Sequence, residues 1–252
     1  MKAIVRLLGL LLAFYLAAAG YMYVKQRDLL FVRDAQPKPL DGFWFPVAPH
    51  TRIWIDRLNP GQPNALLYFP GNTTSDWDDA KRLSKALPHH TLYFVRYRGY
   101  ANSEGSPSQD ALYADALALF DAIKSKYMSI DIMGRSLGTG MAVYTAAKRQ
   151  GGKLLLTTPF DGILLAAKKA YPWLPVSLLI KDPFPNKDFA PAIDEQTEVI
   201  LAKDDQKIPN ISSENLIKTF KKKPEVILLR GVTHSGIVRH PLYLKTLQDF
   251  LE

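Results

Sequence analysis

The sequence predicts an α/β fold in which a mostly parallel, twisted sheet is flanked by helices. Short apolar runs rich in β-branched or aromatic residues, each the length of a buried strand, alternate along the chain with amphipathic helical patterns. The chain has 252 residues, of which 47% are apolar and 22% charged, as in an ordinary globular domain with a substantial core. We therefore expect one large domain with an N-terminal appendage.

The appendage is an apolar segment at the start of the chain. Residues 7–24 carry no charge and have basic residues on both sides. About 18 to 20 apolar residues at helical rise cover the hydrocarbon core of a bilayer. The run therefore predicts a membrane helix, and small residues at 17–19 leave a cleaved signal peptide as the alternative. We expect an anchor or uncleaved signal over 1–25 and the folded domain over 26–252.

The orientation of this single-pass helix depends on charges that nearly balance across it. Lys2 and Arg6 precede the helix, while Lys25 and Arg27 follow it. A very short basic tail before the first apolar helix normally stays in the cytoplasm. The folded domain is accordingly expected on the extracytoplasmic side.

The elements of the folded domain follow in order. Residues 27–49 contain four prolines and are predicted to be an irregular connection. Strands are predicted at 51–58, 65–69, 91–96, 129–133, 153–157, 198–202 and 225–229. Helices are predicted at 76–87, 109–127, 137–150, 212–222 and 241–251. Because ligands bind at the carboxyl ends of strands in such sheets, the residues after each strand are the candidate site.

A serine lies between two glycines directly after the strand predicted at 129–133. Residues 134–138 read Gly-Arg-Ser-Leu-Gly, and a helical pattern follows. In a Gly-x-Ser-x-Gly motif of this context, the serine lies on a strained turn and the glycines let strand and helix approach closely. The alternative is an ordinary glycine-lined turn. Ser136 is therefore the predicted nucleophile.

A serine hydroxyl needs a histidine to accept its proton and a carboxylate to orient that histidine. In this arrangement the acid and then the base follow the serine, each on a loop after a later strand. His234 meets this rule after the strand at 225–229, while His240 precedes a helix and is expected at the surface. Asp204 and Asp205 both follow the strand at 198–202, and their spacing does not decide between them.

Backbone N–H groups must stabilise the oxyanion that forms during acyl transfer. The residue after the nucleophile, Leu137, supplies one in this motif, and a loop after an earlier strand supplies another. Residues 70–74 read Pro-Gly-Asn-Thr-Thr and follow the strand at 65–69. We expect Asn72 to provide the second N–H, although an Asn/Thr cap for the next helix is compatible with the same residues.

These residues resemble the membrane-anchored, single-domain serine hydrolases of the α/β-hydrolase superfamily, which include lysophospholipid, monoacylglycerol and protein-depalmitoylating enzymes. The resemblance covers nearly the whole chain. It is carried by residues 26–31, 69–72, 97–108, 134–138 and 171–175.

The resemblance implies which aspartate is the acid. In this group the acid precedes a short x-x-Ile-Pro stretch, and that register selects Asp205. Many members have histidine where this chain has Pro70, so the support of the oxyanion loop differs here. Substrates vary widely within the group, and none is carried over.

Residues 160–193 lie between the serine and the acid, where a small lid is expected. The apolar, aromatic stretch at 170–176 either lines an acyl chain or packs in the core or against a membrane. The predicted function is a serine hydrolase that cleaves an acyl ester or thioester of a lipid-like substrate. An amide hydrolase or aminopeptidase with the same triad and an inactive, membrane-bound binding protein are the alternatives.

Composition argues against other classes of function. The chain has no cysteine, which excludes a thiol nucleophile and disulfides. Its five histidines have no paired ligand spacing and no glycine-rich phosphate loop follows a strand, so neither a metal nor another cofactor is predicted. The net charge of +8 is spread over short clusters, which does not indicate a nucleic-acid partner.

Overall fold

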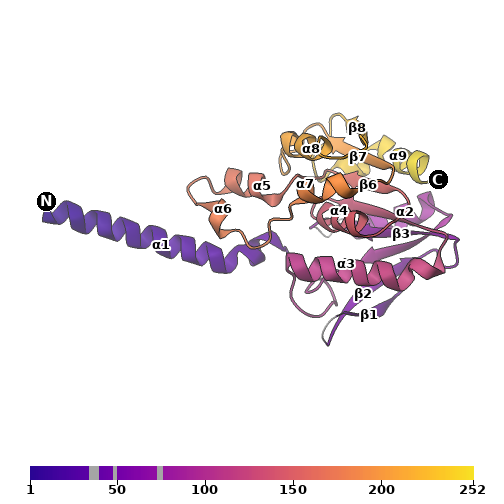
Figure 1. Cartoon of the computed structure of the whole chain (residues 1–252), viewed down its shortest axis with the longest axis horizontal. Helices are drawn as coiled ribbons and strands as arrows, with labels where there is room; N and C mark the ends of the chain where they lie inside the picture. Colours follow the sequence, from indigo (N-terminus) through magenta and orange to yellow (C-terminus); the bar gives the residue numbers. More distant parts are fainter. Residues whose placement is uncertain (34–39, 48–49, 73–75) are drawn as a thin grey trace.

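Eight strands form one sheet among the residues that the structure describes (Figure 1). The computed structural model describes residues 1–33, 40–47, 50–72 and 76–252, with only the backbone at 76–79. The strands are β1 (Gly42–Val47), β2 (Thr51–Leu58), β3 (Asn64–Phe69), β4 (His90–Val95), β5 (Ser129–Arg135), β6 (Leu154–Thr157), β7 (Thr197–Ala202) and β8 (Glu225–Leu229). Their order in the sheet is β1-β2-β4-β3-β5-β6-β7-β8.

Strand direction divides this sheet into two parts. β1 pairs antiparallel with β2, and β2 pairs antiparallel with β4. All pairings from β4 through β8 are parallel. The carboxyl ends of these parallel strands therefore meet at one edge of the sheet, and the prediction of a mostly parallel α/β sheet is confirmed.

Helices cover both faces of the sheet. Side chains of α3 (Gln109–Ile123) and α4 (Gly138–Lys148) pack on one face, and those of α2 (Asp76–Ala86) and α9 (Pro241–Leu251) on the other. The alternation along β3 explains the two cores, because Leu67 joins the first and Leu66 the second. The other α-helices are α1 (Lys2–Leu30), α5 (Ile163–Ala170), α6 (Val176–Leu179), α7 (Asn186–Phe189) and α8 (Asn210–Ile217).

The segment between the N-terminal helix and β2 differs from the sequence prediction. The irregular connection predicted over 27–49 is wrong at both ends, because α1 continues to Leu30 and β1 occupies residues 42–47. Pro46 lies within β1, and an edge strand tolerates proline because one side of it has no partner strand. The other three prolines of that segment lie outside the described residues.

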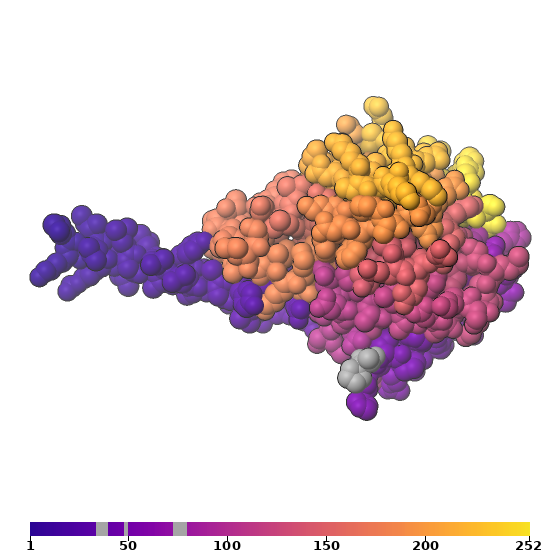
Figure 2. Space-filling view, viewed as in Figure 1, coloured from indigo at the N-terminus to yellow at the C-terminus, as the bar shows by residue number. Residues whose placement is uncertain are grey.

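The helix α1 extends away from the rest of the molecule (Figures 1 and 2). Its 29 residues correspond to about 43 Å at helical rise. It is long and apolar enough to cross a membrane, and little of it is buried. A membrane anchor and a signal sequence both have these properties.

Candidate active site

Ser136 lies on a sharp turn between β5 and α4. Its φ angle is +50°, a left-handed conformation that is uncommon for a residue with a side chain. The N–H of Ser136 donates to the carbonyl oxygen of Thr157 at 2.9 Å, and Thr139 Oγ1 donates to the carbonyl oxygen of Ser136 at 2.6 Å. The strained turn is thus fixed by β6 on one side and by α4 on the other.

The two glycines of the motif allow close packing around this turn. A Cβ atom at Gly138 would lie 1.9 Å from the carbonyl oxygen of Phe69. A Cβ atom at Gly134 would lie 2.6 Å from the Cβ atom of Ala142. Any side chain at either position would force β3, β5 and α4 apart, which is the physical reason for glycine in this pattern.

His234 lies between Ser136 and Asp205. Its Nε2 atom is 2.8 Å from Ser136 Oγ, and its Nδ1 atom is 2.7 Å from Asp205 Oδ2. The histidine side chain is 7% exposed and that of the aspartate 2%. Since an ionised carboxylate only accepts hydrogen bonds, Nδ1 carries the proton and Nε2 is left to accept the hydroxyl proton of the serine.

The structure shows which of the two candidate aspartates contacts His234. Asp205 Oδ1 accepts hydrogen bonds from the backbone N–H groups of Lys207 at 2.9 Å and Ile208 at 2.8 Å, so the turn after β7 aims its other oxygen at His234. Asp204 is exposed, and its N–H donates to the carbonyl oxygen of Val232. Asp205 is therefore the aspartate that lies against the histidine.

Asn72 and Leu137 line the same cavity as Ser136 and His234. Neither of their backbone N–H groups donates a hydrogen bond to another residue in the described part of the chain. The side chain of Asn72 points elsewhere, since its Oδ1 accepts from the N–H of Val32 at 3.0 Å and its Nδ2 donates to the carbonyl oxygen of Leu30 at 2.5 Å. The next residues of this loop, 73–75, lie outside the described residues.

Two tyrosines after β4 hold this loop. Tyr97 OH donates to the carbonyl oxygen of Pro70 at 2.6 Å, and Tyr100 OH donates to Asn72 Oδ1 at 2.5 Å. Both tyrosines are buried. Burial raises the pKa of the Tyr97 and Tyr100 phenols well above the ordinary value, so both remain hydrogen-bond donors at neutral pH.

The cavity has a volume of about 540 Å³ and opens at the carboxyl ends of the strands. Sequence reasoning missed several of its residues, which come from the end of α1, from the motif itself, and from α5 and α8. They include Leu30, Val32, Arg135, Ile163, Ala166 and Ser212. Arg135 is buried, and its Nη2 lies 3.5 Å from the carbonyl oxygen of His234. Only its place inside the Gly-x-Ser-x-Gly motif could have singled it out.

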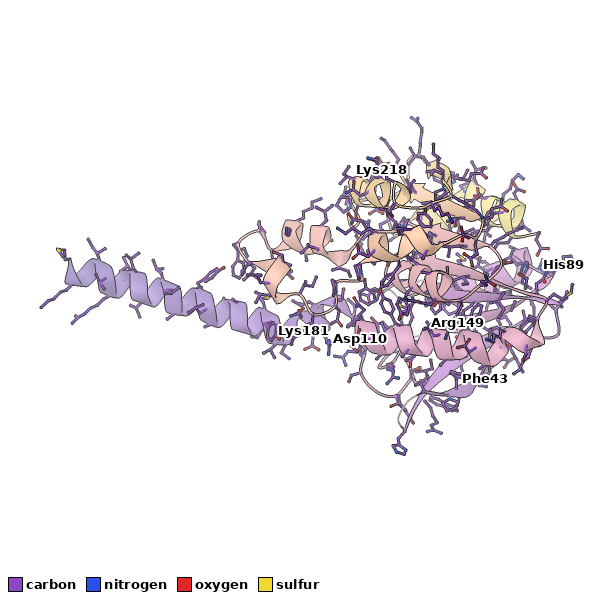
Figure 3. All side chains as sticks on the ribbon, viewed as in Figure 1. Phe43, His89, Asp110, Arg149, Lys181 and Lys218 are labelled. Carbon is purple, nitrogen blue, oxygen red and sulfur yellow. The ribbon has the colours of Figure 1, made fainter. Side chains whose placement is uncertain are left out.

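Of the other histidines, His90 lies away from this site and His240 caps a helix. His90 is buried, with its Nε2 3.0 Å from Asp131 Oδ2 and its Nδ1 3.3 Å from Glu252 Oε1. The preceding residue, His89, lies at the end of the molecule opposite α1 (Figure 3). His240 is partly exposed and accepts from the N–H of Leu242 at the start of α9. Within the described residues, no His, Asp and Glu side chains are grouped as metal ligands would be.

Comparison with known proteins gives distant relatives over most of the chain. An uncharacterised protein of Mycobacterium tuberculosis H37Rv is 27% identical over 242 residues, which cover 87% of this chain and 85% of that protein. Human alpha/beta hydrolase domain-containing protein 17B is 27% identical over 209 residues, which cover 77% of this chain and 68% of that protein. Lysophosphatidylserine lipase ABHD12 of Danio rerio is 30% identical over 138 residues, which cover 50% of this chain and 36% of that protein. No protein-family model matches.

Solved structures share the fold at low sequence identity. The Pyrococcus furiosus esterase Pf2001 superposes with a TM-score of 0.64 at 15% identity, covering 86% of this chain and 98% of that chain. The enol-lactonase of Burkholderia xenovorans LB400 superposes with a TM-score of 0.64 at 17% identity, covering 83% and 99%. These structures show that the chain has the α/β-hydrolase fold, and the sequence comparisons show that it is distantly similar to the ABHD17 and ABHD12 proteins.

Proposed function

We propose that the protein is a serine hydrolase that cleaves an acyl ester or thioester of a lipid-like substrate. The observation that supports this most is the hydrogen-bonded series from Ser136 through His234 to Asp205, which opens into a cavity. The left-handed φ angle of Ser136 supports the same proposal, because it exposes the hydroxyl at the end of β5.

In the proposed reaction, Ser136 Oγ attacks the acyl carbonyl while His234 Nε2 takes its proton. Asp205 holds the ring and stabilises the imidazolium, and the N–H groups of Asn72 and Leu137 stabilise the oxyanion. The imidazolium then gives its proton to the leaving alcohol or thiol as the carbonyl–heteroatom bond breaks. Water, activated by His234, attacks the acyl-enzyme and releases the acid in the same way.

Three features support a lipid-like substrate. The cavity walls include the apolar residues Leu30, Phe160 and Ile163. The helix α1 could cross a membrane, which would hold the site close to lipid. One relative is named as a lysophosphatidylserine lipase, which is an enzyme that hydrolyses a lipid.

We also propose that residues 1–25 form a membrane anchor, that residues 26–252 form the catalytic domain, and that this domain lies outside the cytoplasm. An enzymatic reporter fused to the C-terminus tests the orientation. Reporter activity only in the form that requires export supports it, and activity only in the cytoplasmic form overturns it.

Labelling with a fluorophosphonate probe tests the proposed nucleophile. The probe is expected to modify the wild-type protein at Ser136 and to leave Ser136→Ala unlabelled. Persistent labelling of Ser136→Ala would rule out this serine. Failure of the wild type to react with any serine-directed probe would favour an inactive binding protein.

A substrate panel tests the bond that is cleaved. We expect p-nitrophenyl esters to be hydrolysed and aminoacyl p-nitroanilides to be stable. The opposite preference would make the protein an amide hydrolase with the same site.

A further inference from the structure

A second cavity adjoins the candidate active site. It has a volume of about 320 Å³ and lies between α1 on one side and the α5–α6 segment (residues 163–180) on the other. Most of its wall is apolar, with Met22 and Leu29 from α1, Ala167 and Ala170 from α5, and Leu174 from the connection to α6. We call this cavity the α1 groove.

The α1 groove lies next to the cavity at Ser136 and shares part of its wall. Leu30, Ile163 and Ala166 line both cavities. A chain with its carbonyl at Ser136 would therefore pass these three side chains and enter the groove. The side chains along such a path are apolar, in contrast with the polar atoms that Ser136 and His234 present at its inner end.

Specific contacts hold α1 against the α5–α6 segment and the loop after it. Gln26 Nε2 donates to the carbonyl oxygen of Leu179 at 2.9 Å, and the N–H of Lys181 donates to Gln26 Oε1 at 2.7 Å. Arg27 Nε is 2.7 Å from Asp182 Oδ2, and the Asp182 side chain is 3% exposed. The helix is therefore a fixed wall of the groove.

Two further contacts show how far the α5–α6 segment and the loop after it extend along α1. Tyr15 OH donates to the carbonyl oxygen of Trp173 at 3.2 Å, and Lys181 Nζ lies 3.9 Å from the centre of the Tyr23 ring. Tyr23 follows Tyr15 by eight positions in the helix, which is about 12 Å along the axis. Lys181 accordingly lies near the base of α1 (Figure 3), while Trp173 reaches the middle of the run of residues 7–24.

Two large apolar side chains of this segment are exposed, although Lys168 and Lys169 are exposed on it as well. Trp173 is 50% exposed and Leu178 is 84% exposed. If residues 7–24 cross a bilayer, these side chains lie within the same leaflet as the base of α1, with Lys181 at the interface. Figure 2 shows the segment seated against the base of α1, at the junction between the helix and the body of the molecule.

We propose that the α1 groove is an acyl-chain subsite that receives a long acyl chain directly from the bilayer, with α1 as one of its walls. This proposal rests on the hydrolase function proposed above. It assigns a substrate-binding role to a helix whose length and composition alone indicate only a membrane span. It also predicts that chain-length preference is set by the small side chains of α5.

The first experiment fills the groove and compares long and short substrates. The full chain is placed in nanodiscs of diether phospholipid, which contains no acyl ester, and assayed with p-nitrophenyl laurate and p-nitrophenyl butyrate. Ala167→Trp is expected to lower the laurate-to-butyrate ratio of kcat/KM about tenfold, the effect of leaving about two methylene groups in water. Ser177→Trp is the matched control, because Ser177 is exposed on α6 and does not line the groove. It is expected to leave the ratio unchanged.

The same pair of variants distinguishes the possible sources of the chain. A lauroyl glycerol ester and an S-lauroyl peptide carry the same chain on different leaving groups. A penalty in Ala167→Trp for either substrate supports the groove and identifies the source of the chain. An unchanged rate for both, with p-nitrophenyl butyrate still hydrolysed, overturns the groove while leaving the hydrolase function intact.

A second measurement needs no variant. A long-chain alkyl fluorophosphonate with a diazirine near the far end of its chain is allowed to react with the wild type and is then irradiated. Crosslinks to peptides from 22–30 or 163–180 are expected. Labelled Ser136 with crosslinks only elsewhere overturns the groove, whereas no labelling of Ser136 overturns the hydrolase function and the groove with it.

Discussion

The hydrogen bond between Asp205 and His234 distinguishes two aspartates that are neighbours in the chain. Both follow β7, but the turn formed by Lys207 and Ile208 orients only Asp205 toward the imidazole. The sequence pattern predicted a carboxylate at this place and left two candidates. A side-chain direction set by two backbone N–H groups is not visible in residue spacing.

Paired asparagine substitutions test this difference at the residue scale. Asp205→Asn is expected to lower kcat/KM for an ester by about 10³- to 10⁴-fold, because the amide no longer orients the imidazole and stabilises its cation. Asp204→Asn, at an exposed position, is expected to keep the wild-type value. Comparable losses in both variants would contradict the assignment, and steady-state kinetics measures both.

A second prediction at the residue scale concerns Glu198 and the pH dependence of stability. It is buried on β7, and burial, together with the negative charges of Glu225 and Asp249, raises its pKa to about 7. In the unfolded chain this carboxyl ionises near pH 4.5. The folded protein keeps the proton of Glu198 to a higher pH than the unfolded chain does. The stabilisation that protonated Glu198 contributes is therefore complete below pH 4.5 and is lost as the pH rises through about 7.

Glu198→Gln should therefore stabilise the protein selectively at higher pH. The free energy of unfolding is expected to exceed that of the wild type by about 1 to 3 kcal/mol at pH 8, with a much smaller difference at pH 5. Denaturant unfolding in detergent at the two pH values measures this difference. Glu214→Gln, at an exposed position of α8, controls for the loss of a carboxylate. Equal effects of Glu198→Gln at both pH values would show that the charge of Glu198 is not the cause.

At the scale of elements, the strands and helices that alternate regularly were predictable. The run 198–202 lies in the buried strand β7, as its apolar composition predicts. The run 225–229 is also a strand, but its expected burial is wrong, because β8 lies at the edge of the sheet and Val226 and Leu228 are 40% and 41% exposed. Prediction failed where tertiary contacts decide the structure. The strand β1 contains Pro46, and its pairing with β2 is not encoded in its own pattern.

The motif at residues 26–31 shows a further limit of structure prediction from local sequence patterns. It carried part of the family resemblance, yet its physical basis appears only in three dimensions. Gln26 pairs with the backbone around Leu179, and Phe31 is buried and packs edge-to-face on Phe184. These contacts join residues about 150 positions apart, which no local periodicity reports.

Hydrogen exchange tests the contact between these elements. Gln26→Ala removes the acceptor for the N–H of Lys181, whose exchange is expected to become about three- to tenfold faster. Gln26→Glu keeps an acceptor oxygen while losing the donor to Leu179, so the protection of Lys181 should persist. Equal exchange in the alanine variant and the wild type would mean that α1 does not rest on this segment in solution.

For the whole molecule, the carboxyl edge of the sheet faces the base of α1. Residues that follow β3, β5, β7 and β8 contribute to one cavity, and the end of α1 closes part of it. The histidine cluster at the start of β4 belongs to a different region, since His90 contacts Asp131 and Glu252. The candidate catalytic site thus lies near α1, whereas this ion cluster lies at the start of β4.

The hydrogen bonds of Asn72 to Leu30 and Val32 link the end of α1 to the predicted oxyanion loop. A helix whose apolar run is mismatched to the bilayer changes its tilt. Tilting α1 would therefore displace the backbone N–H of Asn72, which the proposed mechanism places against the oxyanion. The rate of butyrate ester hydrolysis is expected to fall about fivefold when diether nanodiscs are thickened by several ångströms, a change of about 1 kcal/mol.

Enzyme in detergent micelles, which adapt their thickness, serves as the control and should show no such dependence. A rate that stays constant across bilayers would mean that α1 and the loop move independently. If the coupling holds, the proposed hydrolase would change its rate with the thickness of the membrane that holds its proposed anchor, without any ligand, and this thickness differs among cellular compartments.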